Sequence, residues 1–117
     1  MDTKNAVTAM AALAHASRLT IYRHLVELGP EGAYPSDLAQ KFDIPNATLS
    51  FHLKALSHAG LIEAEKNSRN IRYRANFEEM QALVDFLTQN CCGGDPSKCA
   101  PEVRVAADSI RVRSRAR

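Results

Sequence analysis

One helical segment in the middle of the chain limits the possible folds more than any other feature. Leu49, Leu53 and Leu56 recur at positions i, i+4 and i+7, which places them in one apolar stripe along a helix. Asn46 is expected to cap the start of this helix, and Gly60 is expected to end it. The opposite face carries polar, aromatic and basic side chains. The pattern therefore predicts a helix with one buried face and one face free to contact a partner.

Apolar runs and turn residues predict the elements on either side. The expected elements, in chain order, are helices over 5–14, 17–28, 35–42 and 46–59, strands over 61–64 and 71–75, and a closing helix over 76–90. Ser17 is expected to cap the second helix, and Asn76 with Glu79 resembles a capping box for the last one. The fold class is therefore mainly α with a β-hairpin, in the order of a winged helix-turn-helix domain.

Length and composition favour one compact domain. A chain of 117 residues that is 45% hydrophobic can build one core, and we assign residues 1–90 to it. Residues 91–117 are then a cysteine-containing loop and a basic tail, in which 101–117 forms either an amphipathic helix or an unstructured arm. The longest apolar run, Ala9 to Ala14, is too short to span a membrane, so a cytoplasmic protein is expected.

The distribution of charge is more informative than the net charge of +2. Residues 101–117 hold five arginines and two acidic residues, and a second basic region covers residues 41–74. The second region includes the helix with the leucine stripe and the hairpin that follows it. This placement favours double-stranded DNA as a partner, because a helix in the major groove and a hairpin beside it both meet phosphates.

The candidate DNA-binding side chains lie opposite the leucine stripe and in the hairpin. They are Thr48, Ser50, Phe51, His52 and Lys54 on the helix, and Lys66, Arg69 and Arg72, with Arg74, in the hairpin. Hydroxyls can bond base edges, an exposed Phe51 can contact a thymine methyl group, and basic side chains can neutralise phosphates. His52 lies on the flank of the stripe, within expected reach of the DNA backbone. The competing interpretations are a solvated helix face and an ordinary soluble turn.

The run from Ala47 to Ile62, which contains S-x-H-L-K-x-L-x-x-A-G-L, resembles the arsenic-responsive (ArsR) family of bacterial repressors. The similarity extends from about Val7 to Cys99. It implies a homodimer that packs through the first and last helices, binds a palindromic operator and is released by a metal or metalloid. The apolar stripes of those helices also favour a dimer, although such stripes can equally pack within one chain.

Three cysteines, Cys91, Cys92 and Cys99, lie close together after the closing helix. In a reducing cytosol they are expected to be free thiols. The segment resembles ArsR-family variants that bind arsenic just after the closing helix, whereas the histidine and cysteine sites of other family members are absent. Trivalent arsenic favours three sulfur ligands, and a structural zinc ion usually needs four ligands. We therefore expect these thiols to bind As(III), with antimony(III) or organoarsenicals as further candidates.

The resulting hypothesis is an arsenic(III)-responsive repressor that leaves its operator when the thiols are loaded. Alternatives are a redox-responsive repressor of the same fold, or a thiol enzyme or metallochaperone that handles arsenic. An enzyme is disfavoured because only Asp95 and Lys98 lie near the thiols as acid or base groups, and no catalytic cofactor is expected. Whether all three cysteines bind, or only Cys91 and Cys92, stays open at this point.

Overall fold

The computed structural model describes residues 1–99, so the expectations for residues 101–117 lie outside it. The described part of the chain divides into two compact units, one from Met1 to Phe86 and one that begins at Leu87, which are described separately below. The first unit contains the hairpin and all of the predicted helices except the last residues of the closing one, and the second contains the cysteines. None of the helices within residues 1–99 is both long and apolar enough to cross a bilayer.

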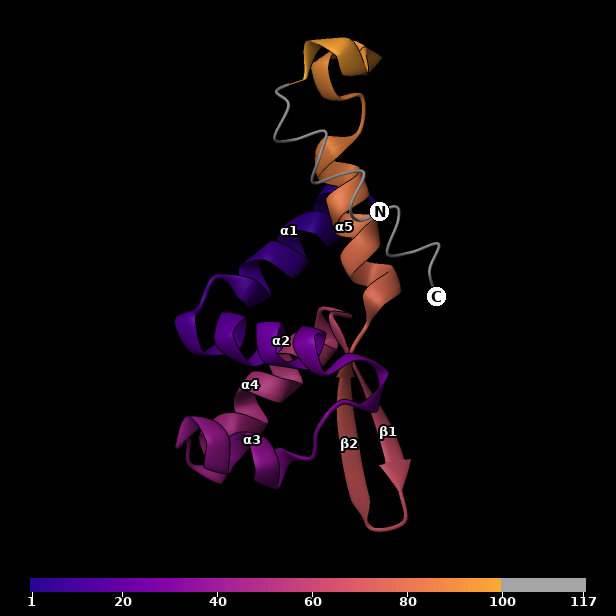
Figure 1. Cartoon of the computed structure of the whole chain (residues 1–117). Helices are drawn as coiled ribbons and strands as arrows, with labels where there is room; N and C mark the ends of the chain where they lie inside the picture. Colours follow the sequence, from indigo (N-terminus) through magenta and orange to yellow (C-terminus); the bar gives the residue numbers. More distant parts are fainter. Residues whose placement is uncertain (100–117) are drawn as a thin grey trace. The chain divides into compact units, whose positions relative to one another are not determined.

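The order of elements agrees with the prediction (Figure 1). The helices are α1 (Thr3–Leu13), α2 (Ala16–Leu28), α3 (Pro35–Phe42), α4 (Asn46–His58) and α5 (Phe77–Thr88); the strands are β1 (Ile62–Asn67) and β2 (Asn70–Ala75). A short 3-10 helix lies between α2 and α3, at Gly29–Glu31, and two more follow α5, at Cys91–Gly94 and Pro96–Lys98. Helices α3 and α4 form the helix-turn-helix, and β1 and β2 form the hairpin.

Two of the predicted helix caps differ from the structure. Helix α2 begins at Ala16, and its cap is His15, whose Nδ1 accepts a hydrogen bond from the Ser17 N–H at 3.2 Å. Helix α4 begins at Asn46 itself, with Pro45 in the cap position and no side-chain cap. In contrast, Asn76 caps α5 as predicted, because its Oδ1 accepts a hydrogen bond from the Glu79 N–H at 3.2 Å.

The core lies where α1, α2 and α4 meet, with α3 and the base of the hairpin closing it. Its largest fully buried side chains are Ile21, Leu25, Leu38, Leu49, Leu56 and Leu61. Leu49, Leu53 and Leu56 are all at most 2% exposed, which confirms the predicted stripe. Burying this stripe fixes the opposite face of α4 toward solvent.

The hairpin is attached to the helices through the loop before α3. Ala33 and Tyr73 exchange two backbone hydrogen bonds, each of 2.8 Å, which adds a bridge to the edge of β2. Gly32 makes this approach possible, because a Cβ atom there would lie 2.0 Å from the Tyr73 carbonyl oxygen. The bridge therefore fixes the base of the hairpin against the domain, while Ser68 and Arg69 form the turn at its tip.

Candidate functional site

The outer face of α4 presents the predicted contact residues. Thr48, Ser50, Phe51 and Lys54 are all exposed, on the side opposite the buried leucines. The Phe51 ring is 64% exposed, so most of its apolar surface faces solvent. The helix therefore offers two hydroxyls, one flat apolar surface and one cation along a single face. These groups are suited to base edges, a thymine methyl group and a phosphate.

His52 differs from this group because its side chain is buried, at 5% exposure. Its Nδ1 accepts a hydrogen bond from Nε of Arg18 on α2, at 3.2 Å. The imidazole does not lie on the exposed face of α4, contrary to the expectation that it is within reach of the DNA backbone. A residue on the flank of the leucine stripe is enclosed here because α2 packs beside α4. Its observed contact is therefore structural, within the domain.

The hairpin separates its basic residues into paired and unpaired ones. Arg72 lies opposite Glu65 across the strands and bonds it at 3.0 Å, and Arg74 bonds Glu65 at 2.7 Å and Glu63 at 3.2 Å. The hydrogen bond and charge of Arg72, together with the charge of Arg74, lower the pKa of Glu65 below its ordinary value. Arg72 and Arg74 are therefore largely neutralised as phosphate ligands.

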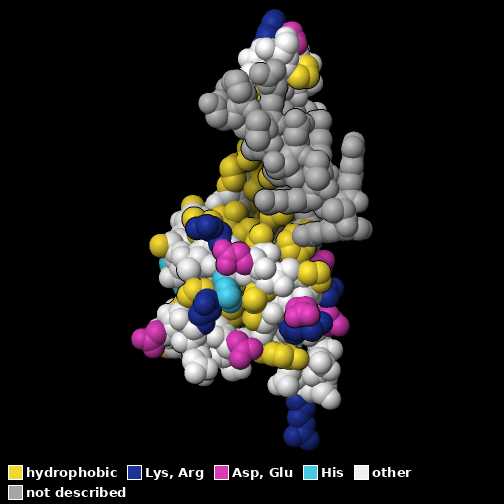
Figure 2. Space-filling view, viewed as in Figure 1, with side chains coloured by type: hydrophobic (Ala, Val, Ile, Leu, Met, Phe, Trp, Pro, Cys, Tyr) yellow, Lys and Arg dark blue, Asp and Glu magenta, His cyan; other side chains and the backbone are white. Residues whose placement is uncertain are grey.

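Lys66 and Arg69 remain as free cations at the far end of the hairpin. Both are exposed, and neither forms an ion pair within residues 1–99. Figure 2 shows Lys or Arg side chains standing out at this end. The sequence did not distinguish among the four basic candidates, whereas the ion pairs across the strands show which two are paired with acidic residues. The tip of the hairpin is therefore the part best suited to grip a phosphate.

In the second unit, the three cysteine thiols converge. Sγ of Cys91 lies 3.7 Å from Sγ of Cys92 and 3.5 Å from Sγ of Cys99, and all three sulfurs lie within 4.8 Å of one another. Cys91 and Cys92 are exposed and Cys99 is half-buried. Within residues 1–99 this is the one group of three or more His, Cys, Asp or Glu side chains close enough to share an ion. The group offers three soft donors and no fourth.

Local backbone geometry brings these thiols together. Cys92 has a left-handed conformation, with φ of 54°, which costs a residue with a Cβ atom about 1–2 kcal/mol. Gly93 and Gly94 continue the turn with positive φ, which glycine adopts freely. Asp95 then caps the turn Pro96–Lys98 and so leads the chain back to Cys99. Residues other than glycine that adopt a left-handed backbone conformation are often found at functional sites, and Cys92 is such a residue.

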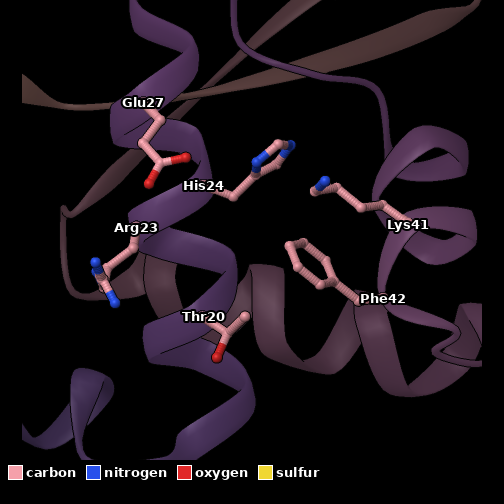
Figure 3. A pocket seen from close by; sticks show the side chains of 6 residues that line it. All are labelled: Thr20, Arg23, His24, Glu27, Lys41 and Phe42. Carbon is pink, nitrogen blue, oxygen red and sulfur yellow. The ribbon is translucent and has the colours of Figure 1, made fainter.

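A shallow hollow of about 200 Å³ lies between α2 and α3 (Figure 3). It is lined by Thr20, Arg23, His24, Glu27, Lys41 and Phe42. The edge of the His24 ring faces Phe42, with their centroids 5.4 Å apart, and the cations are accompanied by Glu27. The hollow is open to solvent and carries both signs of charge, so it does not define a ligand site. The sequence did not indicate it.

Comparison with known proteins agrees with this geometry. Residues 13–65, which contain the whole helix-turn-helix, match a helix-turn-helix domain family. The structure is similar to an ArsR-like transcriptional regulator from Rhodococcus sp. RHA1, with a TM-score of 0.67 and 29% identity over 92% of each chain. This chain has a winged helix-turn-helix fold. No curated protein sequence matches it.

Two further solved structures have the same winged helix-turn-helix fold. HlyU from Vibrio cholerae has a TM-score of 0.61 and 24% identity, over 79% of this chain and 99% of its own. A homodimeric winged helix-turn-helix DNA-binding domain from Mycobacterium bovis, a possible ArsR-family regulator, has a TM-score of 0.60 and 24% identity, over 80% of this chain and 86% of its own. The likeness therefore supports the winged helix-turn-helix fold.

Proposed function

We propose that this chain is a cytoplasmic repressor of the ArsR family that binds operator DNA as a homodimer and releases it when As(III) binds Cys91, Cys92 and Cys99. The observation that supports As(III) as the effector is that the three sulfur atoms lie within 4.8 Å of one another. The DNA-binding part is supported by the winged helix-turn-helix fold and by the exposed face of α4. The two parts can be tested separately.

DNA binding would use α4 in the major groove and the hairpin tip on the backbone. Thr48, Ser50 and Phe51 would contact base edges, and Lys54 would neutralise a phosphate. Lys66 and Arg69 would contact phosphates beside the groove. This assignment follows from exposure and ion pairing, because all six side chains are on the surface, and Lys54, Lys66 and Arg69 form no ion pair within residues 1–99.

The dimer is supported by apolar surface that the single chain leaves uncovered. On α1, Val7 is 55% exposed and Met10 is 40% exposed, although Ala6 and Ala9 on the same helix are buried. On α5, Leu83 alone is buried among residues 77–88. Packing α1 and α5 against those of a second copy would cover these side chains, and the similar domain from Mycobacterium bovis is homodimeric. A symmetric dimer also suits paired half-sites in DNA.

The cysteine group fits a trivalent arsenic centre by the number and softness of its donors. Bound As(III) would form one bond to each of the three sulfur atoms, and these bonds would hold the segment 91–99 closed. Zinc is a poorer fit, because structural zinc sites usually have four ligands and only three are present in the described group. Cys91 follows the end of α5 by three residues, so a closed segment can bias the position of the helix proposed to form the dimer.

The test is a gel-shift titration of the full chain on the DNA upstream of its own gene, with and without arsenite. We expect specific binding that arsenite abolishes, and loss of the arsenite response in Cys91→Ser, Cys92→Ser and Cys99→Ser. An unrelated duplex of equal length is the control for specificity. An unchanged arsenite response in all three variants would refute the thiol site, and equal binding to both duplexes would refute the repressor.

A redox-responsive repressor is a second candidate, favoured by the 3.5 Å contact between Cys91 and Cys99. A peroxide would accept two electrons and two protons from these thiols, which form one S–S bond, while hydrogen peroxide is reduced to two water molecules, or an organic hydroperoxide to an alcohol and one water. Release by peroxide that dithiothreitol reverses, without release by arsenite, would favour this function over arsenic sensing.

A further inference from the structure

Arg18 connects α2 to two neighbouring residues of α4. Its Nε donates to Nδ1 of His52 at 3.2 Å, and its guanidinium carbon lies 5.4 Å from the centroid of the Phe51 ring. A guanidinium at this distance from an aromatic ring is within the range of a cation–π interaction. One side chain therefore holds both the exposed Phe51 and the buried His52.

The hydrogen bond defines the protonation state of His52. An Nδ1 that accepts from Arg18 carries no proton, so the proton of the neutral ring is assigned to Nε2. Protonating Nδ1 would turn the acceptor into a donor that faces the Nε–H of Arg18. It would also place a second positive charge beside the guanidinium. The contact therefore exists only while His52 is neutral.

The surroundings of His52 favour this neutral form. Burial of the ring is the largest effect, and His15 and Arg18 add to it, so the pKa of His52 lies below its ordinary value of 6.5. The His15 ring lies 4.8 Å away, and its own Nδ1 accepts from the Ser17 N–H. These two groups, one at the start of α2 and one within it, are the charged or titratable groups that act on His52.

We propose that Arg18 is a positioning residue that holds Phe51 for base contact, and that neutral His52 holds Arg18, so that operator affinity depends on the charge of His52. The inference rests on the DNA-binding part of the proposed function and does not involve the cysteines. When His52 gains a proton, Arg18 leaves its place and Phe51 loses its support. Operator affinity then falls as the pH drops into the range, below 6.5, in which His52 becomes protonated.

The direction of this effect is diagnostic. Protonating histidines on a DNA-binding protein ordinarily adds positive charge and strengthens attraction to phosphates. A switch at His52 produces the opposite trend, because the new charge disrupts the contact that positions Phe51. A merely structural Arg18 would follow the ordinary trend.

The experiment measures binding of the full chain to its upstream duplex by fluorescence anisotropy, at pH 7.5 and pH 5.5 and constant ionic strength. We expect the wild-type affinity to be lower at pH 5.5 than at pH 7.5, because a larger fraction of His52 is protonated at the lower pH. His52→Asn, whose amide oxygen replaces the Nδ1 acceptor, is expected to lose this fall. His24→Gln on α2 is the matched control, and it is expected to keep the loss of affinity at pH 5.5.

Arg18→Lys separates charge from geometry. Lysine keeps the positive charge but lacks the Nε–H that bonds His52, so we expect weaker operator binding at pH 7.5 and a flattened pH profile. Side-chain 15N NMR of the wild-type chain provides a second readout that needs no variant to fold. It should show the Nε2–H tautomer of His52 and a titration below pH 6.5.

The outcomes test the role of His52 separately from operator binding. Specific binding that stays constant or strengthens toward pH 5.5 overturns the inference and leaves the repressor intact. Equal binding to the upstream and unrelated duplexes at pH 7.5 overturns the repressor. In that case a proton on Nδ1 of His52 in the NMR spectrum would still overturn the role of His52 in holding Arg18.

Discussion

The Asp95 carboxylate accepts two hydrogen bonds from Ser97, from its backbone N–H at 3.0 Å and from its hydroxyl at 2.6 Å. The pair forms the start of the turn Pro96–Lys98, and Cys99 follows directly. An aspartate that bonds the backbone two residues later is a common way to stabilise such a turn. Asp95 therefore positions the third thiol of the cluster.

We predict that Asp95→Ala weakens arsenite binding by a few fold, because Cys99 is then no longer held by the two hydrogen bonds between Asp95 and Ser97. Binding of phenylarsine oxide, whose arsenic needs only two thiols, should change little because Cys91 and Cys92 remain. Isothermal titration calorimetry with both ligands measures the difference. Asp95→Asn keeps an oxygen acceptor and is the control. Equal losses for both ligands would mean that Asp95 does not act through Cys99.

The two kinds of basic residue in the hairpin should differ in their effect on DNA binding. Arg69→Ala removes an unpaired cation and is expected to reduce the slope of log affinity against log salt concentration by about 1. Arg72→Ala should reduce it less, because Arg72 is paired with Glu65 at 3.0 Å. The measurement is fluorescence anisotropy at four or more salt concentrations. Equal slope changes would show that the ion pair opens on DNA.

Glu65→Gln tests the same pair from the other side. The hydrogen bond and charge of Arg72, with the charge of Arg74, lower the pKa of Glu65, so the pair is retained until the pH falls below 4.5. Removing the carboxylate at neutral pH frees Arg72 for phosphates and leaves Arg74 with Glu63 as its one partner. We expect tighter and more salt-dependent binding to any duplex. Unchanged nonspecific binding would contradict the neutralising role of Glu65.

Gly32 should be intolerant of a side chain. Gly32→Ala places a Cβ atom 2.0 Å from the Tyr73 carbonyl oxygen, at a φ of +62° that disfavours alanine. We expect a loss of about 2–4 kcal/mol in the free energy of unfolding, measured by urea denaturation. Gly29→Ala is the control, because it has a similar φ of +73° but no atom within 4 Å of the added Cβ. It should cost less than Gly32→Ala, about 1–3 kcal/mol, because only the backbone conformation opposes it.

Tyr22 has a buried hydroxyl without a hydrogen-bond partner in the described part of the chain. Burial, with a smaller effect of Glu79, raises its pKa to about 12. Tyr22→Phe is therefore expected to leave stability unchanged or raise it by about 1 kcal/mol. Ionisation of the phenol favours the unfolded chain, so wild-type stability falls as the pH rises above 10 toward 12. The variant should lose less stability in that range by urea denaturation, and an equal loss would contradict this.

Patterns along the sequence were sufficient for the elements that depend on local periodicity. The leucine stripe of α4 is buried as its spacing predicts, and Asn76 caps α5 because its side chain needs only a neighbour three residues away. The cap of α2 was wrong for an equally local reason: His15 accepts the hydrogen bond from Ser17, and histidine is not among the favoured cap residues.

The sequence by itself determined which face of α4 is buried, that a basic hairpin follows it, and that three thiols lie within a short segment. These properties depend on the period of a helix, the period of a strand and the distance along the chain. Only the tertiary structure decided that His52 is buried and bonded by Arg18, that Arg72 is paired with Glu65, and that the thiol of Cys99 lies beside that of Cys91. Each of these contacts joins residues whose proximity depends on how the backbone folds back on itself, and no period along the chain records that.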